Sequence, residues 1–138
     1  MLGEKTLLAI DPGSAKCGLA LVHRDEHDAI HMIWHDILAP DKVPARAMEL
    51  HQQHNFTLIV VGNGTRSRSL VESLREEMPS IGILVIDEKD TTMEARERYW
   101  EHNPRKGLRK LLPATLQVPP DAIDDYAALV LAERVLAT

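Results

Sequence analysis

The chain has 138 residues, of which 44% are hydrophobic and 27% charged, and this composition is typical of one ordinary globular domain. We therefore expect a single domain over residues 1–138. One cysteine, Cys17, excludes an internal disulfide, and no apolar run approaches the ~18 residues of a membrane span. The first residues lack the apolar core of a signal peptide, so we expect a cytoplasmic protein with no membrane partner.

The net charge of -5 has the wrong sign for binding nucleic acid through overall electrostatics, so such binding requires a local basic patch. The stretch from Arg96 to Lys110 offers one, with six basic residues against two acidic ones. We call its second half, residues 105–110, the basic segment; it contains Arg105, Lys106, Arg109 and Lys110. It is either a phosphate contact or part of a solvated helix face and loop.

Three continuous apolar runs predict strands that are covered on both faces: Leu7–Ile10, which ends at Asp11, then Leu58–Gly62 and Ile81–Ile86. Two further strands are expected at Gly18–His23 and at about residues 29–38. Helical spacing of apolar residues predicts helices over 41–54 and 67–77.

Two more helices follow. Thr91 and Glu94 have the spacing of a capping box and predict a helix that runs to about Trp100. Pro119 and Pro120 precede an apolar-periodic segment, which predicts a helix from about Asp121 to the C-terminus. Three strands followed by alternating helices and strands predict an α/β domain with a mixed five-stranded sheet.

Acidic residues stand where the predicted parallel strands end, which is where functional groups gather in α/β sheets. Asp11 ends the first strand, and Glu88 closely follows the last one. On the C-terminal helix, the i, i+3 spacing puts Asp121 and Asp124 on one face, whereas Asp125 is turned away and is expected at the surface. Each acid alone also fits a turn, a helix cap or a solvated loop.

Convergence of these carboxylates would be costly without compensation, and Mg²⁺ or Mn²⁺ would provide it because such cations prefer oxygen ligands. Two such ions about 3.5 to 4 Å apart would activate a water and stabilise the leaving oxygen in phosphodiester hydrolysis. The acids therefore indicate nuclease chemistry.

Four motifs together resemble the YqgF/RuvC branch of the RNase H-like superfamily, in the same order and over nearly the whole chain. They are Asp11-Pro12-Gly13-Ser14, Gly18-Leu19-Ala20, Asp87-Glu88 with Thr91-Thr92-Met93-Glu94-Ala95, and Asp121-Ala122-Ile123-Asp124 with Ala127-Ala128. The resemblance implies an RNase H-like fold, a divalent-metal site of Asp11, Glu88, Asp124 and an assisting Asp121, and a nucleic-acid substrate. YqgF-like proteins are associated with processing of precursor 16S rRNA, whereas RuvC-like proteins are Holliday junction resolvases that act on branched DNA.

The position of the catalytic Glu separates the two branches. RuvC-like resolvases carry it after the fourth strand, where this chain has Gly62-Asn63-Gly64-Thr65, and the YqgF pattern puts it after the fifth strand, where Glu88 stands. The resemblance therefore favours a YqgF-like protein. In the implied sheet order the fifth strand lies two positions, or about 10 Å, from the first, so Glu88 must reach inward.

The loop Gly62–Thr65 has two interpretations. Its backbone N–H groups could hold a phosphate, with Arg66 and Arg68 adding charge, or it could be a tight turn before a helix. Two functional hypotheses stay open: a metal-dependent endonuclease on structured RNA or branched DNA, and a binding module for nucleic acid or protein that cleaves little. A resolvase would require a two-fold dimer, and the sequence does not distinguish a monomer from a homodimer.

Overall fold

A computed structural model describes residues 2–64, 66–104, 113, 117–119 and 121–137. Its centre is a five-stranded sheet in the order β3-β2-β1-β4-β5. Strands β1 (Lys5–Asp11), β2 (Cys17–Arg24) and β3 (Ile30–Leu38) form an antiparallel meander, and β4 (Leu58–Gly62) and β5 (Gly82–Ile86) extend the sheet in parallel from β1. The expected mixed five-stranded sheet is confirmed.

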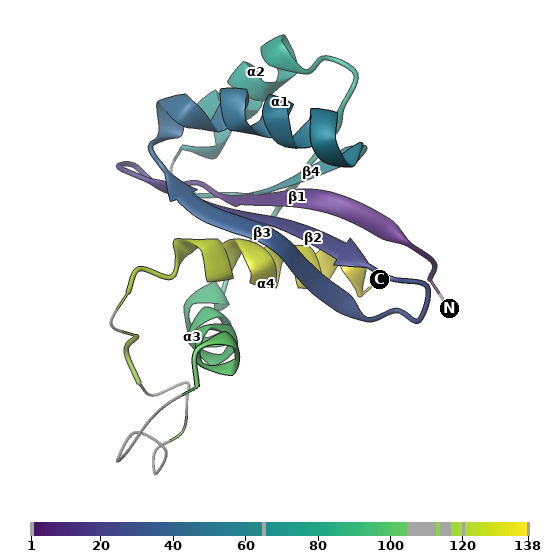
Figure 1. The fold of residues 1–138 in the computed structure, drawn as a ribbon. Helices are drawn as coiled ribbons and strands as arrows, with labels where there is room; N and C mark the ends of the chain where they lie inside the picture. Colours follow the sequence, from purple (N-terminus) through teal and green to yellow (C-terminus); the bar gives the residue numbers. More distant parts are fainter. Residues whose placement is uncertain (1, 65, 105–112, 114–116, 120, 138) are drawn as a thin grey trace.

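Helices cover both faces of this sheet (Figure 1). The 3-10 turn η1 (Pro40–Lys42), α1 (Val43–His54) and α2 (Ser67–Glu77) lie on one face. On the other face α4 (Asp124–Leu136) packs on β1 and β2, and α3 (Thr91–His102) packs on α4. None of the helices in the described part of the chain is long and apolar enough to cross a membrane.

Alternation along β1 divides the core in two and fixes where the strand's last side chain points. Leu8 and Ile10 pack with α1 and α2, whereas Leu7 and Ala9 pack with α4. Because successive side chains of a strand point to opposite faces, Asp11 continues the series of Leu7 and Ala9. The carboxyl of Asp11 therefore emerges on the face that α4 covers.

Two expectations about helix starts are wrong. The C-terminal helix begins at Asp124 rather than at about Asp121, so the two acids do not share a helix face. Thr91 is the first residue of α3 and not its cap; Asp90 precedes it in a left-handed conformation (φ 64°), and no side-chain cap bond forms. Glu94 instead accepts a hydrogen bond from Arg134 at 3.1 Å, which joins α3 to α4.

Gly18 allows the start of α4 to lie directly against the β1–β2 hairpin. A Cβ atom at this position would collide with the backbone carbonyl of Asp124. The motif glycine therefore determines how closely Asp124 approaches Asp11, whose backbone pairs with Gly18 in the sheet.

We expect Gly18→Ala to lower the free energy of unfolding by about 1–3 kcal/mol, because the collision involves backbone atoms that cannot rotate away. Urea unfolding followed by circular dichroism measures this change. Ser14→Ala, an exposed substitution in the same hairpin, should leave stability unchanged. Equal stability of both variants would show that α4 does not depend on the close approach.

Candidate active site

Three carboxylates meet at the edge of the sheet where β1, β4 and β5 end. Asp11 is the last residue of β1, Glu88 is the second residue after β5, and Asp124 is the first residue of α4. Asp11 and Glu88, which are 77 positions apart in the sequence, thus meet through the parallel strands, and Gly18 of the hairpin lets Asp124 approach them. The structure brings together these three of the four acids that were expected to form the site.

Asp11 is at the centre of the group, and its surroundings raise its pKa from 3.8 to about 8. Burial contributes most, because a charged carboxylate is poorly solvated there. A side-chain hydrogen bond with Glu88 comes next, followed by the negative charges of Glu88 and Asp124. At neutral pH Asp11 therefore retains its proton while no cation is bound.

The proton has a definite acceptor in Glu88. Oε2 of Glu88 is buried and lacks any hydrogen-bond donor in the described residues while both carboxyls are ionised. Two carboxylates cannot bond to each other, whereas a protonated Asp11 can donate to Glu88. The charge of the Glu88 carboxylate is therefore compensated either by a proton on Asp11 or by a cation between the two side chains.

Glu88 spans the two strand positions because the intervening loop has almost no side chains in its way. A Cβ atom at Gly62 would lie 2.7 Å from Oε2 of Glu88, and one at Gly64 would lie 2.8 Å from Oε1. Between them Asn63 accepts a hydrogen bond from the backbone N–H of Glu88 at 3.2 Å. The described part of this loop accommodates a carboxylate of its own chain. Sequence reasoning missed this role, although two glycines around Asn63 were its signal.

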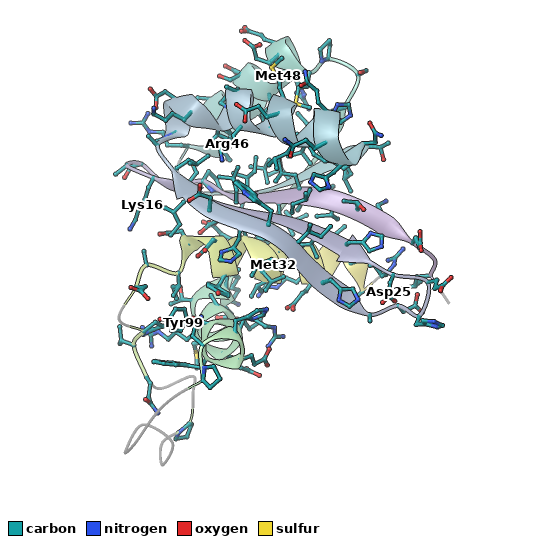
Figure 2. All side chains as sticks on the ribbon, viewed as in Figure 1. Lys16, Asp25, Met32, Arg46, Met48 and Tyr99 are labelled. Carbon is teal, nitrogen blue, oxygen red and sulfur yellow. The ribbon has the colours of Figure 1, made fainter. Side chains whose placement is uncertain are left out.

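Asp124 has a different partner. Nζ of Lys16, from the β1–β2 hairpin, lies 3.4 Å from Oδ2 of Asp124. Figure 2 shows Lys16 projecting at the same side of the molecule as the first turn of α4. Lys16 belongs to no motif that would have marked it in the sequence as a partner of the acids.

Asp121 precedes α4 and does not share a helix face with Asp124. The hydroxyl of Tyr99, on α3, donates a hydrogen bond to Oδ2 of Asp121 at 2.9 Å. Tyr99 and Trp100 are themselves buried in the core, where Tyr99 packs edge-on against Trp100 and Tyr126. The place of Asp121 is thus set by α3, and no described contact joins it to Asp11 or Glu88.

The expectation that Asp125 is a surface acid is wrong. It is 6% exposed, and its Oδ2 accepts a hydrogen bond from Nδ1 of His35 on β3 at 2.6 Å. Its Oδ1 accepts the backbone N–H of Tyr126 at 3.1 Å. The pair ties the first turn of α4 to the edge strand of the sheet.

The basic residues are placed only in part. Arg66 and Arg68 are exposed at the start of α2, and neither forms an ion pair with the residues that the structure describes. Arg66 also lines a pocket of about 400 Å³ together with Cys17 and Asp41. Arg105, Lys106, Arg109 and Lys110 lie outside the described residues.

The acids fit a hard divalent cation by their chemistry, although they are not yet arranged around one. No three His, Cys, Asp or Glu side chains within the described ranges are grouped as a metal centre as they stand. Asp11 and Glu88 interact with each other, and Asp124 interacts with Lys16. Carboxylate oxygens suit Mg²⁺ or Mn²⁺, and the buried Oε2 of Glu88 has an unused coordination position. Binding would therefore require these pairs to open.

Solved structures with the same fold include three Holliday junction resolvases. A fowlpox virus resolvase, solved in complex with Holliday junction DNA, has a TM-score of 0.63 at 9% identity and covers 96% of this chain and 97% of its own. Thermus thermophilus RuvC gives 0.61 at 10%, covering 95% and 93%, and the yeast mitochondrial resolvase Ydc2 gives 0.54 at 13%, covering 96% and 78%. The chain therefore has the RNase H-like fold of these resolvases.

No protein-family model matches the sequence, and a search of curated proteins finds no match either.

The raised pKa of Asp11 makes stability depend on pH. Between about pH 4 and 8 the folded protein keeps a proton that the unfolded chain releases, so the free energy of unfolding falls as pH rises through this window. Asp11→Asn removes this contribution, because an amide carries no charge. We expect the difference in free energy of unfolding, variant minus wild type, to increase from pH 5 to pH 8, as measured by urea unfolding in EDTA. A pH dependence identical to that of the wild type would show that Asp11 titrates normally.

Proposed function

We propose that the chain is a divalent-metal-dependent endonuclease that hydrolyses phosphodiester bonds in structured nucleic acid. The observation that carries the proposal is the contact between the carboxyls of Glu88 and Asp11, in which Oε2 of Glu88 is buried with no donor among the described residues and the charge of Asp124 also acts on Asp11. Two acidic side chains in such contact are costly to stability, so a ligand that neutralises them gives the arrangement a purpose. The resolvase-like fold supports the same chemistry.

Asp11, Glu88 and Asp124 are the residues that would hold Mg²⁺ or Mn²⁺. The bound metal would supply positive charge that activates a water and stabilises the leaving oxygen. Asp11 must release its proton to become a ligand, and Glu88 is positioned by Gly62 and Gly64 to share the same cation. An assisting role is proposed for Asp121 because it lies three residues before Asp124, with its Oδ2 bonded to the hydroxyl of Tyr99 on α3.

The nucleic-acid path is proposed to follow the positive charge around this edge. Arg66 and Arg68 lie on the α2 side, and the basic segment, with Arg105, Lys106, Arg109 and Lys110, precedes α4 in the chain. These residues would neutralise backbone phosphates, which the acidic protein does not otherwise attract. We propose that the protein acts in the cytoplasm, as a monomer or a homodimer.

Precursor 16S rRNA is the proposed substrate, because the catalytic Glu follows the fifth strand as in the YqgF pattern. The contact between Glu88 and Asp11 supports this arrangement, and the fourth strand ends at Gly62 with no acid among the next described residues. Branched DNA is the second candidate. It is favoured by the likeness of the fold to resolvases over more than nine-tenths of this chain.

Cleavage assays with Glu88→Gln test the proposal. The amide keeps the shape of the side chain but removes its charge, and we expect activity to fall by roughly 100-fold or more, as when a principal electrostatic group is lost. Glu72→Gln, at an exposed position of α2, is the matched control and should retain activity. A precursor 16S rRNA and a synthetic four-way DNA junction serve as parallel substrates.

The outcomes separate the hypotheses. Faster cleavage of the RNA supports the YqgF-like function, and faster cleavage of the junction supports the resolvase. Binding of either substrate without cleavage by the wild type would favour the binding module. Equal activity of Glu88→Gln and Glu72→Gln would remove Glu88 from the site.

A further inference from the structure

Lys16 is the cation that the fold itself supplies to the acidic site. Its Nζ lies 3.4 Å from Asp124, and no other Lys or Arg in the described ranges forms an ion pair with Asp11, Glu88 or Asp124. Its side chain is 52% exposed and that of Asp124 is 33% exposed. An exposed ion pair of this kind contributes little to the free energy of unfolding. We therefore consider how the charge of Lys16 affects the acidic site.

The backbone of the β1–β2 hairpin places Lys16 beside Asp124, and its side chain is half-exposed. Gly13 lets the hairpin fold tightly, because a Cβ atom at Gly13 would collide with the carbonyl of Lys16. Gly18 holds the other side of the hairpin against Asp124. The hairpin is thus packed closely on itself at Gly13 and on α4 at Gly18, whereas the long side chain of Lys16 is half-exposed.

We propose that Lys16 is the resident counter-ion of the metal-free site and that it exchanges partners when divalent cations bind. In the metal-free protein its ammonium neutralises Asp124. A divalent cation on the same carboxylate repels the ammonium at close range, and the ammonium then binds a backbone phosphate of the nucleic acid. This inference rests on the proposed function, because it assigns the substrate contact to the same site.

Titration of Mn²⁺ in the absence of nucleic acid tests the first half. Removing the competing charge in Lys16→Met should tighten Mn²⁺ binding by about three- to tenfold. Lys5→Met, at the opposite end of β1, is the matched control and should leave binding unchanged. In the Asp124→Asn background the effect of Lys16→Met should disappear, because the competition operates through Asp124.

Salt dependence of nucleic-acid binding tests the second half. The probe is whichever of the precursor RNA and the four-way junction the wild type binds more tightly, kept intact with Ca²⁺ in place of Mg²⁺ and checked on a gel. With Ca²⁺, Lys16→Met should reduce the slope of log affinity against log salt by about 0.7 to 0.9, the contribution of one phosphate contact. In EDTA, where Lys16 remains paired with Asp124, the slope should not change.

Weaker or unchanged Mn²⁺ binding by Lys16→Met would overturn the competition, and an equal loss of slope in EDTA and Ca²⁺ would overturn the exchange of partners. Neither result would affect the proposed nuclease. Failure of the wild type itself to bind Mn²⁺ would instead remove the proposed function, and this inference with it.

Discussion

The partly buried carboxyl of Asp11, in contact with Glu88 and close to Asp124, is the interaction on which the rest of the site depends. Burial removes the water that would solvate its charge, and its two neighbours add repulsion, so the group keeps a proton to about pH 8. A protein under selection for stability alone would place an apolar side chain there. The arrangement is understandable if the proton is exchanged for a cation during function.

Several features of the fold make this contact possible. The alternation of β1 sends Asp11 toward α4, and Gly18 lets the backbone of Asp124 approach the hairpin. Gly62 and Gly64 leave room for Glu88 to extend inward from beyond the edge strand. Each glycine leaves space where a carboxylate or its backbone lies. The cost is the side-chain packing that a larger residue would contribute at that position.

The strands and the main acids could be predicted from the sequence because both depend on local patterns. Continuous apolar runs mark the strands, and Asp11 and Glu88 follow from where those runs end. The expectation that all three runs are covered on both faces is wrong for β5, which is an edge strand with Leu84 and Val85 exposed. Contacts between distant segments carry no such pattern. Asp125 is buried because His35, 90 residues earlier, reaches it from β3, and helical rotation alone pointed it to solvent.

The predicted start of α4 was wrong for a related reason. Two prolines before Asp121 are a typical sign of a helix start, but Asp121 is bonded to Tyr99 of α3 and the helix begins three residues later. The inward reach of Glu88 needed the three-dimensional course of the Gly62–Gly64 loop, which neither spacing nor composition contains. Lys16 was missed because an isolated lysine in a turn has no sequence signature.

Calorimetric titration of Mg²⁺ at pH 7, in two buffers that differ in ionisation enthalpy, shows whether Asp11 loses its proton when the cation binds. The difference in heat between the buffers counts the protons that leave the protein on binding. Because Asp11 must lose its proton to become a ligand, release of about one proton per protein is predicted for the wild type and almost none for Asp11→Asn. Mg²⁺ binding without proton release in the wild type would show that Asp11 does not exchange its proton for the cation.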